Sequence, residues 1–151
     1  GGSTYEKIKG KNLGASPSVD TKGAFKMYSQ LASAIEQGLV ASCHDMSDGG
    51  LAVAMAESAI GGMCGCDVDL SGIPGDAGLD DIRTLFAESP SRFVVSVKKE
   101  NADKFEKLLA GAPFKRAGET NSSDAVAFKK DGKTILSITC SEIVKAWKRE
   151  I

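Results

Sequence analysis

The amino-acid sequence predicts an α+β fold, in which helices cover one mixed β-sheet. Three observations support this class. Apolar residues recur at helical spacing over 21–37, they alternate with polar residues over 92–98 except at Val94, and Asp131-Gly132 separates two strand-like runs. Because 151 residues are enough for one core, and no linker-like segment divides the chain, we expect a single domain over 1–151.

Helices are expected in five places. The first spans 21–37 and ends at Gly38, since glycine accepts the backbone angles of a helix stop. Its predicted inner stripe is Ala24, Phe25, Tyr28, Leu31, Ala32 and Ile35. The second, 51–60, is apolar on nearly every side, which indicates burial. Two more follow at 79–87 and 101–109, and Ser141 is expected to cap the last, with an inner stripe of Ile143, Val144, Trp147 and Ile151.

Strands are expected between these helices. They cover 38–41, 66–70, 92–98, 125–129 and 134–139. Over 92–98, Phe93, Val95 and Val97 form one apolar face. The Asp-Gly pair between the last two strands predicts a hairpin, because glycine accepts a positive φ.

Composition limits the classes of function. The 19 basic and 20 acidic side chains give a net charge of −1, which does not favour a nucleic-acid partner. No apolar run has membrane length and no signal peptide is recognisable, so we expect no membrane association and a cytoplasmic setting. The sequence begins with Gly1 rather than Met, so we expect the chain to be a piece of a larger protein or a processed product. The four cysteines are expected to be free, mostly buried thiols.

The most informative segment is Ser42 to Leu51, which places acids, a hydroxyl and two glycines between a strand and an apolar helix. A helix N-terminus carries about half a positive charge and unpaired N–H groups, so such a turn suits a phosphate. A nearby Asp is suited to bind a divalent cation through oxygen. The alternative is an ordinary helix start, capped by Ser47 or Asp48 and eased by the glycines.

A second polar loop, 86–92, carries Glu88, two serines and Arg92 between a helix and a strand. It could bind an anion or a polar substrate. It could equally be a capped turn in which Pro90 fixes φ.

Two motifs carry a family resemblance. Residues 44–57 (HDMSDGGLAVAMAE) resemble the HDxSxGGLAVALAE segment of phosphoribosylformylglycinamidine synthase, and 86–97 (FAESPSRFVVSV) resemble its FSESQSRFVVSV segment. The opening Gly1-Gly2-Ser3, and Ala146-Trp147-Lys148 near the end of the chain, are similar to the limits of its C-terminal domain. The resemblance therefore spans nearly the whole chain.

This resemblance implies a three-layer α/β/α fold, partly similar to ferredoxin-like topology, and the C-terminal domain of the second repeat of a larger synthase. The intact family enzyme uses ATP, Mg²⁺ and glutamine-derived ammonia to convert formylglycinamide ribonucleotide into its amidine, in purine biosynthesis. At the matching positions, Asp45 is implied as a metal ligand and Ser47 as a contact of ATP or ADP. We extend the predicted nucleotide contacts to Asp48, Gly49 and Gly50, whose backbone shares the turn. The implied partners are the remaining domains of the same synthase, a glutaminase and small accessory subunits.

The resemblance assigns no catalytic residue to this chain, because the catalytic His and main metal carboxylates lie in other domains of the family. We therefore expect no turnover from the chain alone. Pro90 replaces the family's Gln and removes its amide, so Glu88 and Ser89 are not expected to bind substrate. Two alternatives stay open. One is another ATP-binding relative, such as selenophosphate synthetase, thiamine-monophosphate kinase or a hydrogenase-maturation enzyme, and the other is a structural assembly module.

Overall fold

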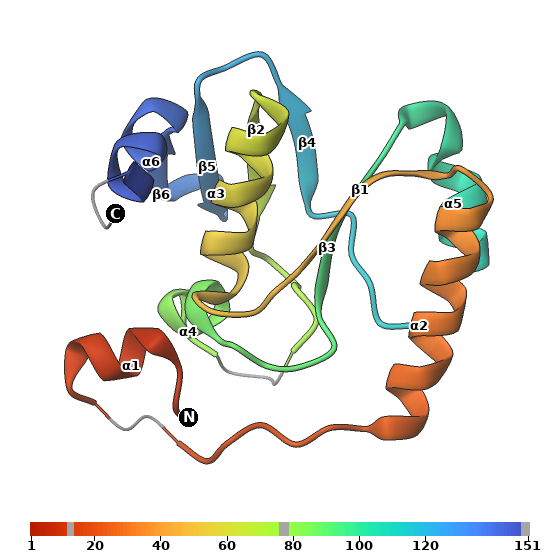
Figure 1. Ribbon diagram of the computed structural model, residues 1–151, viewed down its shortest axis with the longest axis horizontal. Coiled ribbons are helices and arrows are strands. Elements are labelled where there is room, and N and C mark those ends of the chain that lie inside the picture. The colour runs from red at the N-terminus through yellow and green to blue at the C-terminus, as the bar shows by residue number, and fades with distance from the viewer. Residues whose placement is uncertain (12–13, 76–78, 149–151) are drawn as a thin grey trace.

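A computed structural model of the protein describes residues 1–11, 14–75 and 79–148, and it confirms the α+β class (Figure 1). The helices are α1 (Thr4–Lys9), α2 (Thr21–Glu36), α3 (Gly50–Gly62), α4 (Asp81–Phe86), the 3-10 helix η1 (Lys99–Asn101), α5 (Ala102–Leu108) and α6 (Cys140–Trp147). The strands are β1 (Val40–Asp45), β2 (Gly65–Asp69), β3 (Phe93–Val97), β4 (Gly118–Asn121), β5 (Ala125–Lys130) and β6 (Lys133–Thr139).

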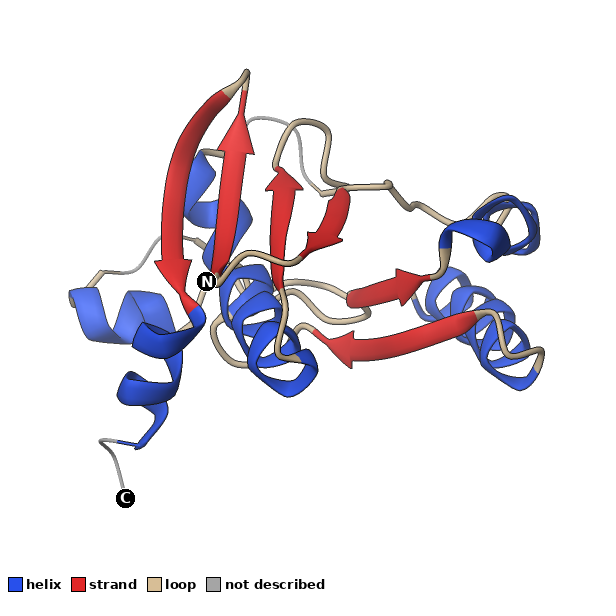
Figure 2. Cartoon of the chain, turned by 90° about the horizontal axis from the view of Figure 1, so that it is seen from above, coloured by secondary structure: helices blue, strands red, loops and turns tan. Residues whose placement is uncertain are grey.

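The strands form two sheets rather than the single sheet that we expected. One has the order β4-β2-β5-β6, in which β2 and β5 are parallel and the other neighbours antiparallel. The other is the antiparallel pair β1-β3, with an irregularity between Val40 and Ser42. Figure 2 shows that the strands of this pair run across those of the larger sheet. Strands that cross in this way cannot form ladder hydrogen bonds with the larger sheet, so the pair is a separate sheet.

Each sheet has its own core. Helices α3, α4 and α6 pack on the four-stranded sheet through Leu51, Ala52, Ala59, Cys66, Val68, Leu70, Leu85, Val126, Phe128 and Ile143. Helices α2 and α5 pack near the β1-β3 pair through Leu31, Ala34, Leu39, Phe105 and Leu109. Because β1 leads directly into α3, the turn between them joins the two cores.

Local sequence explains several element boundaries. Asp131 and Gly132 have φ values of 50° and 74°, which confirms the predicted hairpin turn between β5 and β6. Helix α6 begins two residues earlier than expected, since Thr139 rather than Ser141 is its N-cap. The Thr139 hydroxyl accepts from the Glu142 N–H, and the Glu142 carboxylate accepts from the Thr139 N–H.

The predicted inner stripes are only partly buried. Leu31 and Ile143 are buried, as expected, but Phe25 is 74% exposed and Trp147 is 57% exposed. Tyr28, Ala32 and Ile35 are exposed as well, and Ile151 lies outside the described residues. Helical spacing identifies the apolar residues of a helix. In α2 and α6 these residues extend around more of the helix surface than the core covers, so some of them are exposed.

Other expectations need smaller corrections. Helix α1 and strand β4 were not expected, and β1 continues to Asp45 rather than ending at Ala41. The four thiols are free, but only Cys66 is buried, and Cys43 is exposed. None of the described helices is long and apolar enough to cross a bilayer.

Candidate functional site: the turn between β1 and α3

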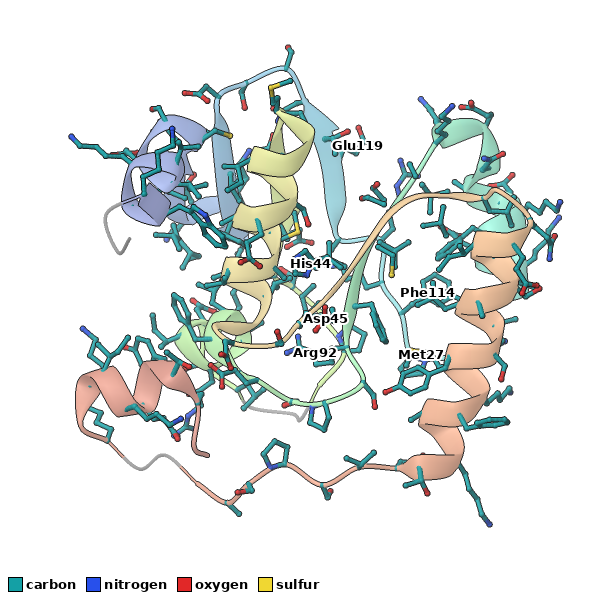
Figure 3. All side chains as sticks on the ribbon, viewed as in Figure 1. Met27, His44, Asp45, Arg92, Phe114 and Glu119 are labelled. Atoms are coloured by element: carbon teal, nitrogen blue, oxygen red, sulfur yellow. The ribbon has the colours of Figure 1, made fainter. Side chains whose placement is uncertain are left out.

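Asp45 ends strand β1, and the turn that follows it leads into α3. Asp45 pairs with Phe93 of β3, and the Met46 N–H donates to the Arg92 carbonyl at 2.9 Å, which extends the ladder by one bond. The Gly50 N–H then donates to the Ser47 carbonyl at 3.0 Å and closes the turn. Figure 3 places Asp45 close to Arg92, between α3 and β3, with His44 just above.

Both glycines are required by this geometry. Gly49 and Gly50 have φ values of 81° and 61°, in the left-handed region that side chains disfavour. A Cβ on Gly49 would lie 2.2 Å from a methyl carbon of Val53, and one on Gly50 would lie 2.6 Å from the Ala87 carbonyl oxygen. The two glycines therefore let the turn approach both α3 and the end of α4.

Glu88 completes the turn from the opposite side. Its carboxylate oxygen Oε1 accepts from the Gly49 N–H at 2.8 Å and from the Thr4 N–H at 2.8 Å. Burial raises the pKa of Glu88, but these hydrogen bonds and the nearby Lys7 outweigh it and hold the pKa below its ordinary value. Glu88 thus acts as the anion at the start of α3, a role that sequence reasoning missed. The sequence shows both Glu88 and the glycine-rich start of α3. Because Glu88 and Gly49 are 39 residues apart, the sequence gives no sign that they are in contact.

The rest of the 88–92 loop is held by α2 and α4. Ser91 has a φ of 63°, and its hydroxyl lies 2.7 Å from the Tyr28 hydroxyl. The Arg92 guanidinium donates to the Ala87 carbonyl at 3.3 Å, and burial lowers the pKa of Arg92. The structure therefore supports the capped-turn interpretation of this loop, with Glu88 directed at the turn rather than at solvent.

Three polar side chains of the turn face solvent. Asp45 has a side chain that is 66% exposed, and Ser47 and Asp48 are exposed, whereas Gly49 and Gly50 are buried. Neither Ser47 nor Asp48 caps α3, because Gly49 is the N-cap residue and α3 has no side-chain cap. The alternative of a Ser47 or Asp48 cap is therefore wrong. The turn therefore presents two carboxylates and a hydroxyl to solvent.

A metal ion would need ligands beyond this turn. Across 1–11, 14–75 and 79–148, no group of three or more His, Cys, Asp or Glu side chains is arranged to hold one. Asp45 could therefore supply only part of a coordination shell.

His44 faces a separate hollow behind the turn. Its Nδ1 donates to the Asp45 carbonyl at 2.6 Å, and its Nε2 lies 3.1 Å from a carboxylate oxygen of Glu57 on α3. The hollow is lined by His44, Glu57, Ile60, Gly61, Val144, Trp147 and Lys148. The exposed Trp147 forms one wall of it, so the expectation that Trp147 belongs to the inner stripe of α6 is wrong.

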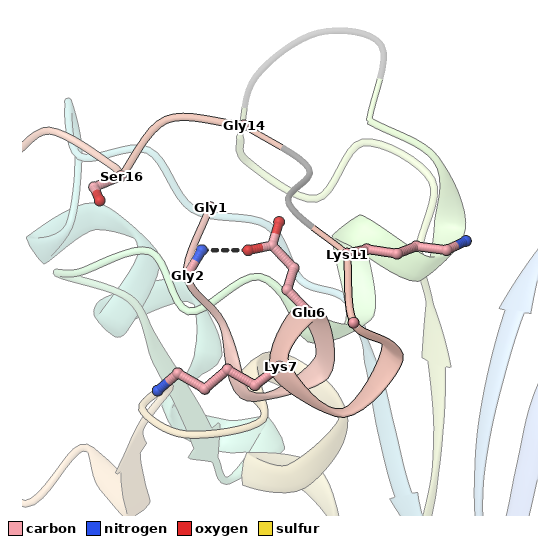
Figure 4. Close-up of a pocket in the computed structure, with 8 residues that line it drawn as sticks. Gly1, Gly2, Glu6, Lys7, Lys11, Gly14 and Ser16 are labelled. Atoms are coloured by element: carbon pink, nitrogen blue, oxygen red, sulfur yellow. Dashed lines mark hydrogen bonds between the residues drawn. The ribbon is translucent and has the colours of Figure 1, made fainter.

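A second hollow lies beside α1 and does not include the turn (Figure 4). Its lining includes Glu6, Lys7 and Lys11, and the buried Glu6 carboxylate accepts from the Gly2 N–H. Because this acid holds the N-terminal segment, the hollow is a feature of local packing.

Comparison with protein families assigns the fold. Residues 1–131 match the family described as AIR synthase related protein, C-terminal domain. The chain belongs to this family. The match covers the strand, turn and helix of the candidate site and the loop that carries Glu88.

Solved structures agree with this AIR synthase-related fold. Phosphoribosylformylglycinamidine synthase II from Thermotoga maritima has a TM-score of 0.76 at 17% identity, over 84% of this chain and 22% of that one. The T. maritima PurL complexed with FGAR has a TM-score of 0.73 at 18% identity, over 80% of this chain and 20% of that one. The hydrogenase maturation protein HypE has a TM-score of 0.61 at 19% identity, over 86% of this chain and 46% of that one. The chain thus spans about a fifth of the length of the PurL structures.

Proposed function

We propose that this chain is the C-terminal domain of an ATP-dependent phosphoribosylformylglycinamidine synthase, and that its β1-α3 turn contacts a nucleotide phosphate or its Mg²⁺. One observation carries the proposal. Asp45, Ser47 and Asp48 expose their polar side chains together, on a backbone fixed by two glycines and Glu88. A turn held in this way presents oxygen ligands without the entropy loss of ordering a loop.

The known structures of similar fold support the same class of ligand. T. maritima PurL has been solved in complexes with ATP, ADP, AMPPCP and FGAR. The motif resemblance supports Asp45 as a metal ligand and Ser47 as a nucleotide contact. Because the chain covers about a fifth of the PurL structures, we assign the reaction to a longer protein and only contacts and packing to this domain.

The hydrogen bonds of the turn define how a phosphate would bind. The Gly49 N–H is engaged by Glu88, and the Gly50 N–H by the Ser47 carbonyl. A phosphate would therefore contact the Ser47 hydroxyl and the N–H groups of Ser47 and Asp48, while Gly49 and Gly50 shape the backbone. Asp45 would offer one carboxylate to Mg²⁺, and the remaining ligands would come from the phosphates, water and other domains.

The chain would not catalyse the reaction alone. Amidine formation requires ATP to activate the substrate amide and ammonia to replace its oxygen. The described residues contain no assembled base and metal cluster for these steps. We expect purified chain, supplied with formylglycinamide ribonucleotide, ATP, Mg²⁺ and ammonium, to form no amidine. Product in proportion to chain concentration would contradict this division of roles.

The proposed partners are the remaining synthase domains, a glutaminase and a small accessory subunit, in the cytoplasm. A T. maritima PurLQS assembly has been solved, which supports a multi-subunit setting for synthases of this fold. HypE is the second candidate, since it has a similar fold and has been solved with ATP. Measuring ATP hydrolysis by the intact protein distinguishes the synthase from the HypE candidate. The synthase proposal predicts that hydrolysis depends on formylglycinamide ribonucleotide.

Calorimetry on the intact protein tests the contact itself. We expect Asp45→Asn to weaken binding of Mg-ADP about tenfold, or about 1.4 kcal/mol, because a metal-directed charge is lost. The matched control is Asp103→Asn, which removes an exposed carboxylate on α5 and should leave affinity unchanged. Equal affinity for wild type and Asp45→Asn, with and without Mg²⁺, would contradict the proposed role of Asp45.

A further inference from the structure

Helix α2 carries two apolar stripes, of which only one faces the core. Leu31 and Ala34 are buried and belong to the core cluster that contains Phe105 and Leu109 of the α5 region. A second stripe is exposed to solvent over much of its area, with Phe25 at 74%, Tyr28 at 43% and Ile35 at 50% exposed, and the exposed Ala32 between them. These four positions follow a spacing of three, four and three residues, which forms one continuous seam along a helix.

The centre of this seam is held in place. The Tyr28 ring packs edge-on against Phe93, with centroids 5.7 Å apart and planes at 86°, and its hydroxyl lies 2.7 Å from the Ser91 hydroxyl. A side chain fixed by such contacts loses little further entropy on binding a partner. The seam is therefore an ordered apolar surface.

The spacing of the seam is the same in both chain directions. If a second α2 is laid antiparallel, Phe25 faces Ile35 of the other copy, and Tyr28 faces Ala32 of the other copy. A large side chain then meets a smaller one at each of these positions, as efficient packing between helices requires. The seam is thus complementary to itself.

The charges beside the seam favour the same partner and orientation. Lys22 lies in the first turn of α2 and Glu36 is its last residue, and both are exposed. The α2 dipole disfavours a cation at its start and an anion at its end, so the helix alone does not account for this placement. The two residues are fourteen apart, or two heptads, so they flank the seam on the same side. Antiparallel pairing about a two-fold axis brings Lys22 of each copy to Glu36 of the other, whereas parallel pairing puts these charges on opposite sides of the seam and forms neither ion pair.

We propose that the α2 seam is a self-association surface, through which two copies of this chain pair antiparallel about a two-fold axis. Such an interface is isologous, because the same residues contribute from both copies. A single helix pair is small beside the ~1,200 Å² that stable complexes typically bury, so the dimer should be weak and reversible. The proposal does not depend on the nucleotide contact, and its test does not involve nucleotide.

Sedimentation equilibrium of the chain tests the association. The average mass should rise from one chain toward two between micromolar and millimolar concentrations. Phe25→Ser should raise the dissociation constant at least about tenfold, because it removes the most exposed apolar side chain of the seam. Ile8→Ser is the matched control, since Ile8 is 76% exposed on α1, away from the seam, and should leave the constant unchanged. The circular dichroism of both variants should match wild type, because neither side chain lies in a core.

Charge reversal tests the orientation. Lys22→Glu and Glu36→Lys should each weaken the dimer, and the double variant should recover it, because the pairs reform with opposite sign. Both reversals also suit the α2 dipole, so loss of the helix is not expected. An average mass of one chain at every concentration would overturn the proposal. The seam would then be a contact surface for another domain or for a lipid surface. Equal effects of Phe25→Ser and Ile8→Ser, or no recovery in the double variant, would overturn it as well.

Discussion

The Glu88 carboxylate accepts the Gly49 N–H at 2.8 Å, so the loop after α4 supplies the anion that the first turn of α3 lacks. The same oxygen also accepts the Thr4 N–H, which ties α1 to the site. One side chain therefore holds together three segments that are far apart in the chain.

Removing this carboxylate should destabilise the fold. We expect Glu88→Ala to lower the free energy of unfolding by about 1–3 kcal/mol, because the N–H groups of Gly49 and Thr4 lose their acceptor in a partly buried place. Denaturant titration measures the loss. Glu100→Ala, which removes an exposed acid from η1, is the control and should stay within about 0.5 kcal/mol of wild type.

The effect of Glu88 should depend on pH. Its pKa in the folded chain lies below the ordinary value of 4.5, so its charged form stabilises the fold above that pH. This contribution is lost as the pH falls through the folded pKa, where the carboxylate becomes protonated. Glu88→Gln should therefore differ most from wild type at neutral pH and least in acid, as measured by melting temperature. A difference that grows on acidification would contradict the assignment.

Gly50 should tolerate substitution less well than another glycine of similar backbone. Gly50 and Gly72 have φ values of 61° and 68°, but a Cβ on Gly72 would meet nothing within 4 Å. Alanine at Gly72 should cost about 1 kcal/mol from the left-handed backbone alone. Alanine at Gly50 should cost about 1–3 kcal/mol more, because it also collides with the Ala87 and Leu85 carbonyls. Equal losses in the denaturant midpoint would mean that the close approach is not needed.

Truncation should destabilise the fold much more at Ile143 than at Trp147. Ile143 is 7% exposed, so Ile143→Ala should cost about 2–5 kcal/mol. Trp147 is 57% exposed, so Trp147→Ala in this chain should cost less than about 1 kcal/mol, rather than the 3–5 kcal/mol range typical of a buried aromatic. Chemical denaturation of both variants checks the order, and a larger loss at Trp147 would show that its hollow closes in solution.

The sequence predicted the helices and strands better than the contacts between them. Helix α3 and the β5-β6 hairpin are found as expected, because apolar periodicity and an Asp-Gly turn are local signals. The contact of Glu88 with Gly49 and the exposure of Trp147 depend on which segments meet in space. Periodicity does not contain that information. The division into two sheets was missed for the same reason, because the apolar pattern of a strand does not indicate which strand pairs with it.

The candidate site was predicted in part by pattern and in part by resemblance. The pattern correctly grouped an acid, a hydroxyl and two glycines at the start of α3. It placed Asp45 in the turn, whereas the structure places it at the end of β1. The metal role of Asp45 and the nucleotide roles of Ser47, Asp48, Gly49 and Gly50 stay predictions.

A nuclear magnetic resonance titration of the ¹⁵N-labelled chain with Mg-ADP tests the central claim most directly. The isolated turn offers only part of a pocket, so binding should be weak, in the millimolar range or about 4 kcal/mol. We predict that the largest amide shifts fall between Asp45 and Gly50, and that Asp45→Asn reduces their dependence on Mg²⁺. Shifts that are absent at saturating nucleotide, or that fall around the Trp147 hollow while the turn stays unchanged, would contradict the proposed phosphate contact.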